Sequence, residues 1–273
     1  LSHMSGLTYD FMLRTNVDAA YRKTKLQATG DLQAMIDTLA QLPLEFSPGE
    51  QWNYSVSTDV CGYLVEHFSG MKLDKYFQKH IFDPLGMEDT GFSCAKEKVD
   101  RLASLYEQHP KKGPVLVDPG GAKTARVKKR KMLSGGGGLL STMSDYYRFC
   151  SMLLNQGELD GTRIIGRKTL AMMASNHLPD HKDLTEMSQS AFSETTYQGV
   201  GFGLGFSVIL DPVKTQSLTD IGEYGWGGAA STVFWVNPKE EMVVIFLTQL
   251  LPSSTYQVRR ELRSLVYSSL MPE

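Results

Sequence analysis

The chain has 273 residues, of which 41% are hydrophobic and 21% charged, and its formal net charge is -2. This length can bury a substantial core, as one large domain or two modest ones. The near-balanced charge gives no indication of a nucleic-acid partner, and no apolar run is long enough to span a bilayer.

Two helices are predicted in the N-terminal quarter of the chain. Residues 31–42 carry apolar side chains on one face and are followed by Pro43, which predicts a helix that ends there. Residues 57–69 carry a second apolar stripe, and Gly70 is a suitable stop. The cap of this second helix would be one of three polar residues, Ser57, Thr58 or Asp59.

The middle of the chain alternates helices with irregular segments. The segment LDKYFQKHIF predicts a helix that is closed by Asp83-Pro84. Residues 107–131 combine prolines with a basic run at 123–131, so we expect an irregular, solvated loop. The alternative for the basic run is a surface that steers an anionic substrate. Further helices are predicted over 145–157 and 167–177, followed by a polar loop over 180–198.

The glycine-rich stretches do not indicate a nucleotide site. The segment SGGGG, residues 134–138, lacks the lysine of a Walker A loop, and GVGFGLGF, residues 199–206, does not match the spacing of GxGxxG. We instead expect the 134–138 loop to approach another surface closely. Ser141 or Thr142 would then cap the following helix.

The last third of the chain changes to a period of two. From Val200 to Leu210 apolar side chains alternate with glycines, which predicts one strand with a glycine-lined face where another segment packs closely. Residues 231–249 are typical of a hairpin, and a final helix begins near Tyr256. Helices followed by antiparallel strands and a closing helix indicate an α+β protein.

Cysteine and histidine usage gives no sign of a metal site. The sequence has three cysteines, Cys61, Cys94 and Cys150. They are too few and too scattered for a disulfide framework or a metal-binding CxxC pair. We expect reduced thiols in a reducing compartment, which favours the cytoplasm, with one disulfide as the alternative. Pro179 lies between His177 and His181 and disfavours a helical pair of metal ligands.

Four blocks of sequence, in the same order, resemble the serine β-lactamase-like superfamily. They are LSHMSGLTY, the segment from PGEQWNYSVSTD to MEDTGF, SGGGGLLSTMSDYYRF and YGWGGAASTVFWVNP. The segments YSVSTD and WGG are most similar to those of family VIII carboxylesterases. Class C β-lactamases carry Y-x-N and K-T-G at the same two positions. The resemblance implies a fold of the β-lactamase and penicillin-binding-protein type, an antiparallel sheet flanked by helices plus a helical lobe. Residues 1–195 would form mainly the helical lobe, and residues 196–273 the strands and the C-terminal helix.

The resemblance also implies catalytic residues. In the superfamily a serine is acylated by a carbonyl substrate, and a lysine and a tyrosine share the proton transfers. Tyr54 matches that tyrosine and would be the base, the alternative being one more half-buried aromatic residue. The pKa of an unperturbed phenol is about 10, so this role requires a neighbouring cation to stabilise the phenolate. The backbone N–H of Ala229 would be one oxyanion donor.

A further set of residues would contact the substrate. They are Ser55, Trp226, Gly227 and Gly228. Trp226 stands where lactamases carry a lysine and would offer an apolar wall, which favours neutral esters; the alternative is an ordinary sheet aromatic residue. No metal or cofactor is needed for this chemistry.

The acylating serine is absent from this set. An S-x-x-K pair places an amine one helical turn from a hydroxyl. The two matches, Ser69–Lys72 and Ser93–Lys96, lie at a helix stop and after a turn, so we expect neither to be catalytic. In the superfamily the pair lies upstream of the LSHxSGL segment, where this chain begins. We therefore expect an upstream N-terminal segment to supply the serine and complete the fold, and the chain alone to be inactive with exposed sheet edges.

Together these inferences predict a serine hydrolase, specifically a carboxylesterase that cleaves short-chain esters through an acyl-enzyme. Its partner would be a small-molecule ester or amide. One alternative is acyl transfer of the β-lactamase, D-aminopeptidase or transpeptidase type. The other is a non-catalytic binding protein that retains the β-lactamase fold.

Overall fold

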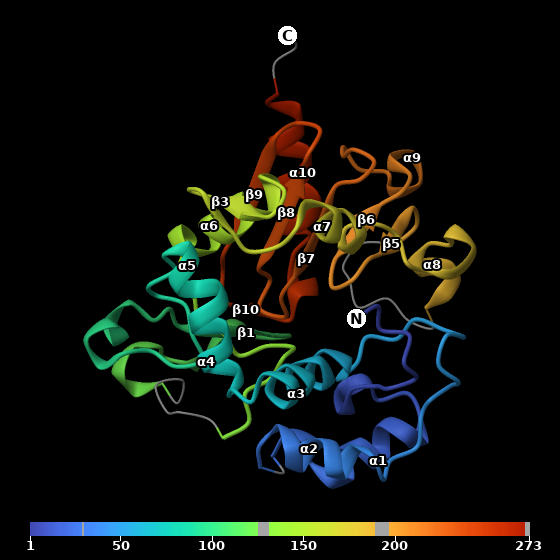
Figure 1. Ribbon diagram of the computed structural model, residues 1–273, viewed down its shortest axis with the longest axis vertical. Coiled ribbons are helices and arrows are strands. Elements are labelled where there is room, and N and C mark those ends of the chain that lie inside the picture. Colours follow the sequence, from blue (N-terminus) through green and yellow to red (C-terminus); the bar gives the residue numbers. More distant parts are fainter. Residues whose placement is uncertain (29, 125–130, 189–196, 271–273) are drawn as a thin grey trace.

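The computed structural model describes residues 1–28, 30–124, 131–188 and 197–270. Figure 1 shows an antiparallel sheet built from the C-terminal part of the chain, with the first three helices gathered at the opposite end of the molecule. This arrangement of helical lobe and sheet confirms the predicted α+β fold.

The central sheet has five antiparallel strands in chain order. They are β5 (Val200–Phe202), β6 (Ser207–Ile209), β7 (Tyr224–Gly227), β8 (Val233–Asn237) and β9 (Met242–Phe246). All residues of β8 are buried, as expected for a strand that is covered on both faces. The register between β7 and β8 places Trp226 opposite Phe234.

Two helices cover opposite faces of β8. Phe234 and Val236 belong to a core cluster with residues of α6 (Met143–Leu154). Trp235 lies on the other face, where the Arg263 guanidinium of α10 (Val258–Ser268) is 4.5 Å from its ring centroid. Successive side chains of a strand point to opposite faces, so α6 and α10 enclose the sheet between them.

The helical lobe has its own core. Its helices are α1 (Asn16–Thr24), α2 (Leu32–Leu39), α3 (Ser57–Ser69) and α4 (Leu73–Phe77). Tyr21, Met35 and Leu73 are fully buried and pack in one cluster. Both predicted helices are therefore confirmed, although the first ends at Leu39 and not just before Pro43.

Two details of the lobe correct the predictions. The N-cap of α3 is Val56, without a side-chain cap, so Ser57, Thr58 and Asp59 lie inside the first turn. The predicted helix that begins with α4 does not close at Asp83-Pro84. It continues as a π-helical segment, Gln78–Phe82, into α5 (Asp83–Leu85) and ends at Gly86, whose left-handed φ of +63° is typical of a glycine at a helix end.

The segment 107–131 is more ordered than its composition predicts. It contains most of β1 (Leu105–His109) and all of β2 (Gly113–Asp118), which form a hairpin, and β1 pairs in parallel with β10 (Leu250–Leu251). The prediction of an irregular loop was wrong here because the backbone hydrogen bonds of a distant strand stabilise the hairpin. Residues 125–130 of the basic run lie outside the described residues.

The remaining short elements lie between α6 and the sheet and after β6. They are β3 (Glu158–Leu159), β4 (Thr162–Arg163), α7 (Arg167–Met173), α8 (Leu184–Met187) and α9 (Pro212–Thr215). Helix α8 falls in the predicted polar loop over 180–198, and an Asp183–Glu186 capping box explains it. Residues 189–196 of that loop lie outside the described residues.

The strand predicted from Val200 to Leu210 is a hairpin instead. Gly205 has φ +100°, which turns the chain between β5 and β6. The predicted close approach is nonetheless confirmed at Gly203, where an added Cβ would lie 2.1 Å from the Met173 carbonyl oxygen. The turn also changes the faces: Val200 and Phe202 lie on the same face as Ile209, and Val208 lies on the opposite face.

The SGGGG loop approaches α3 as expected. A Cβ on Gly135 would lie 2.1 Å from the Thr58 carbonyl oxygen, and one on Gly136 would lie 2.5 Å from the Thr58 hydroxyl oxygen. Thr142 accepts a hydrogen bond from the Asp145 N–H and caps α6, which confirms that prediction too.

The division of the chain near residue 195 stays a prediction. Among the described residues, no helix is long and apolar enough to cross a membrane. The same part of the chain holds no group of three or more metal-ligating side chains.

Candidate active site

A network around Asn53 fixes the turn that carries Tyr54. The Asn53 amide donates to the carbonyl oxygen of Leu7 at 2.9 Å and to the Glu45 carboxylate at 3.0 Å. Arg14 donates to the Asn53 side-chain oxygen at 2.7 Å. Asn53 is buried, so these bonds form in a low-dielectric environment and hold the segment before α3 in place.

Tyr54 lies in an aromatic cage drawn from three separate segments. Its ring centroid is 4.9 Å from His3, 5.2 Å from Tyr9, 6.3 Å from Trp52 and 5.6 Å from Trp226. The rings are tilted or stacked, as is usual for aromatic pairs. The cage fixes the direction of the phenol and excludes water from most of the ring.

The environment of Tyr54 acts on its pKa in both directions. Burial is the largest influence and raises the pKa, and the nearby Asp59 carboxylate adds to it. Hydrogen bonds from Trp226 and Tyr9 lower the pKa, because donors to the phenol oxygen favour the phenolate. The net pKa is above the ordinary value, so a base role for Tyr54 requires a cation beyond these contacts.

Tyr9 and Asp59 were not predicted from the sequence as site residues. Asp59 is fully buried at the start of α3, accepts a hydrogen bond from Ser134, and burial raises its pKa. Burial also raises the pKa of Tyr9 above its usual range, so this phenol donates to Tyr54 as a neutral group. Tyr9 lies in LSHMSGLTY and Asp59 in YSVSTD, but these segments do not reveal that the two side chains meet Tyr54.

Ala229 lies in the turn between β7 and β8 and is exposed. The turn is closed by two hydrogen bonds, from Gly228 N–H to the Thr232 carbonyl oxygen at 2.8 Å and from Ser231 N–H to the Gly228 carbonyl oxygen at 3.1 Å. The Ala229 N–H has no hydrogen-bond partner among the described residues. It is therefore available to donate to a ligand.

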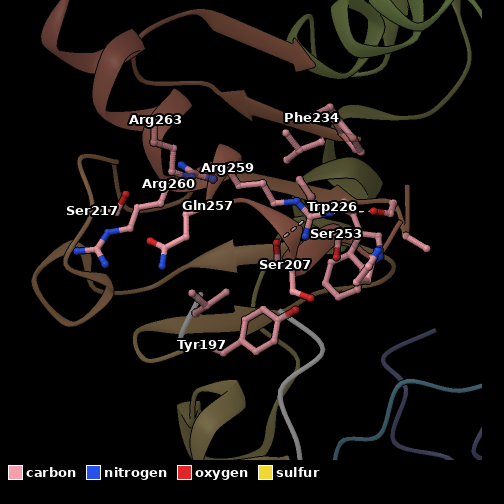
Figure 2. Close-up of a pocket in the computed structure, with 18 of the residues that line it drawn as sticks. Tyr197, Ser207, Ser217, Trp226, Phe234, Ser253, Gln257, Arg259, Arg260 and Arg263 are labelled. Carbon is pink, nitrogen blue, oxygen red and sulfur yellow. Dashed lines mark hydrogen bonds between the residues drawn. The ribbon is translucent and has the colours of Figure 1, made fainter. Parts of the chain in front are cut away.

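Tyr54 and Ala229 line the same cavity, which has a volume of about 880 Å³. Five of the six predicted site residues line it: Tyr54, Trp226, Gly227, Gly228 and Ala229. Figure 2 shows the cavity between Tyr197, Trp226 and the arginines of α10. Its volume is in the range of small-molecule sites.

Ser55 does not line this cavity. Its side chain is fully buried, and its hydroxyl hydrogen-bonds with Ser57 at 2.8 Å and with His3 Nδ1 at 3.3 Å. Its burial gives no support to a contact with substrate, which stays a prediction.

Neither S-x-x-K match lies beside Tyr54. Ser69 donates to the Val65 carbonyl oxygen at the end of α3, and Lys72 pairs with Glu66 at 3.0 Å. Ser93 lines a different cavity, of about 490 Å³. These placements agree with the expectation that neither serine is the nucleophile.

His3 makes stability depend on pH. Burial lowers its pKa to about 4, whereas the pKa of an unfolded histidine is about 6.5. The unfolded state therefore binds more protons between these values, and the free energy of unfolding should fall by about 3 kcal/mol as the pH drops from 6.5 to 4. Urea unfolding at several pH values, for the unmodified protein and for His3→Gln, measures this. An identical pH dependence in the variant would show that His3 is not the cause.

The chain is similar in sequence to one protein family and to several curated proteins. A family model described as Beta-lactamase matches residues 1–268. Protein Rv1367c of Mycobacterium tuberculosis is 30% identical over 92% of this chain and 61% of its own length. Esterase EstB of Burkholderia gladioli is 28% identical over 91% of this chain and 63% of its own. The chain thus spans about three fifths of the length of these curated relatives.

A solved structure shares the fold. EstCE1, described as a hydrolase with promiscuous acyltransferase activity, superposes with a TM-score of 0.80 at 24% identity, covering 98% of this chain and 70% of that one.

Proposed function

Because this chain belongs to the β-lactamase family, we propose that it contributes the proton-transfer tyrosine and one oxyanion donor to a serine esterase. The reaction would be hydrolysis of a short-chain carboxylic ester through an acyl-enzyme. One observation carries the proposal: the Tyr54 side chain and Ala229 line a single cavity of about 880 Å³, together with Trp226.

Tyr54 acts on protons in both halves of the proposed reaction. As phenolate it takes the proton of the attacking serine, and it returns that proton to the leaving alcohol when the tetrahedral intermediate collapses. Water then attacks the acyl-enzyme with the same assistance and releases the acid. The Ala229 N–H donates to the oxyanion in each tetrahedral intermediate.

The serine and its lysine would come from a segment outside this chain. The curated relatives are longer than the chain, and Ser69 and Ser93 lie away from Tyr54. An S-x-x-K lysine would also supply the cation that the buried phenol requires, because an adjacent positive charge favours the phenolate.

Trp226 supports an ester rather than a β-lactam substrate. It offers an apolar wall where a substrate carboxylate would need a cation, and its indole N–H donates to Tyr54. Trp226→Phe keeps an aromatic ring but removes this donor, so the pKa of Tyr54 should rise. We expect kcat at neutral pH to fall about tenfold, the equivalent of one hydrogen bond. The pH–rate profile of the full-length variant measures this: its ascending limb, along which the phenol loses its proton, should move to higher pH, and an unshifted ascending limb would contradict the prediction.

Substrate choice tests the proposal. The protein expressed from its complete reading frame should hydrolyse p-nitrophenyl butyrate with a kcat/KM far above that for nitrocefin. Preference for nitrocefin would favour the β-lactamase alternative. Turnover of neither would favour a binding protein that keeps the fold without the chemistry.

A further inference from the structure

Arg259, in the first turn of α10, holds the turn that presents Ala229. Its guanidinium donates to the Gly228 carbonyl oxygen at 2.9 Å and to the Thr232 carbonyl oxygen at 3.2 Å. These two carbonyl groups lie on either side of Ala229 in the chain. Figure 2 shows the Arg259 side chain reaching from α10 toward the end of the strand that carries Trp226.

The strand leaves room for this guanidinium only because residue 227 is glycine. A Cβ on Gly227 would lie 2.5 Å from the guanidinium carbon of Arg259. A Cβ on Gly228 would lie 2.2 Å from the Thr232 hydroxyl oxygen. The glycines of the WGG segment thus permit a tight turn and a close cation, in addition to lining the cavity.

The direction of the Ala229 N–H follows from the Gly228 carbonyl group. Both belong to one peptide unit, which is planar and trans, so the N–H points away from the C=O. Arg259 and the Ser231 N–H hold that carbonyl oxygen on one side, at 2.9 and 3.1 Å. The Ala229 N–H therefore points to the opposite side of the peptide unit, away from the Arg259 guanidinium. A cation on the carbonyl oxygen also polarises the unit and strengthens its N–H as a donor.

We propose that Arg259 is a positioning residue for acyl transfer, which fixes and polarises the peptide unit whose N–H stabilises the oxyanion. This inference rests on the proposed function. Arg259 touches no reacting atom in this account. It acts through the Gly228–Ala229 peptide, and one guanidinium nitrogen, Nη2, donates to both carbonyl oxygens.

Two variants of the full-length protein test the inference, Arg259→Ala and Arg259→Lys. The matched control is Glu261→Gln, an exposed residue of the same helix turn that does not line the cavity. For Arg259→Ala we expect kcat for p-nitrophenyl butyrate to fall about 10- to 100-fold, since a misplaced donor loses most of its effect on the transition state. KM should stay within about threefold. The kcat of Arg259→Lys should lie between that of Arg259→Ala and that of the unmodified protein. The kcat of the Glu261→Gln control should match that of the unmodified protein.

The inhibition constant of an alkylboronic acid provides a readout that a purely structural role would not move. The boronic acid forms a tetrahedral anion on the serine, so its inhibition constant should rise in Arg259→Ala by the same factor by which kcat falls. Unchanged kcat and boronate affinity per titrated active site would overturn the inference while leaving the proposed function intact. Absence of any serine adduct in the unmodified protein would overturn both.

Discussion

Replacing Tyr54 with phenylalanine is expected to lower kcat/KM for a short-chain ester by roughly 10²- to 10⁴-fold, the usual contribution of a general base. The variant keeps the ring that packs with His3, Tyr9 and Trp226, so the cage should survive. Only the hydroxyl is lost, and with it the group that accepts the serine proton. Steady-state kinetics of the full-length protein on p-nitrophenyl butyrate measure the loss.

A second tyrosine provides the control for that experiment. The Tyr63 hydroxyl in α3 donates to the Gln33 side chain at 2.9 Å and lies outside the cavity lining. Tyr63→Phe also removes one hydroxyl and one hydrogen bond, but kcat/KM should change little. If Tyr54→Phe retained kcat/KM within about threefold, a role for this phenol in proton transfer would be untenable.

Replacing Ala229 with proline is expected to lower kcat by roughly 10²- to 10³-fold, as for other oxyanion donors, because proline has no N–H. Ala229 is not among the residues with positive φ, so the backbone excludes one common source of strain from a proline ring. KM should change much less than kcat, since the N–H acts mainly in the transition state.

The matched control keeps the N–H and changes the side chain. Ala229→Ser should retain activity close to that of the unmodified protein. If Ala229→Pro is folded by circular dichroism and yet retains kcat, the oxyanion donor must lie elsewhere in the cavity.

The sequence predicted the parts of the site that short motifs carry. Tyr54 in YSVSTD and Trp226 to Ala229 in WGGA lie far apart in the chain, and only the resemblance linked them before the structure placed them on one cavity. Ser55 follows Tyr54 in sequence but is fully buried, because adjacency does not determine which way a side chain points.

Other parts of the site were not recognised from the sequence. His3, Tyr9 and Asp59 reach Tyr54 through the packing of the helical lobe, and Arg259 reaches Gly228 from the last helix. The first three lie in the segments LSHMSGLTY and YSVSTD, but a segment does not show which of its side chains meet. Their roles come from tertiary contacts, which propensity and period do not describe.

The fold was predictable where local chemistry decides the structure. Apolar stripes, and the cap at Thr142, marked helices correctly. The hairpin of β1 and β2 was missed because its prolines and lysines favour a loop, while pairing with β10 favours a strand. The turn at Gly205 was hidden by an alternation that continues through it.

The most direct test of the central claim, that Tyr54 serves a serine acyl-enzyme, is to label the full-length protein with a fluorophosphonate and map the modified peptide. We expect one labelled serine, outside this chain and followed three residues later by lysine. Its labelling should be slowed in Tyr54→Phe but not in Tyr63→Phe. A label on Ser69 or Ser93, or no label on intact folded protein, would contradict the account.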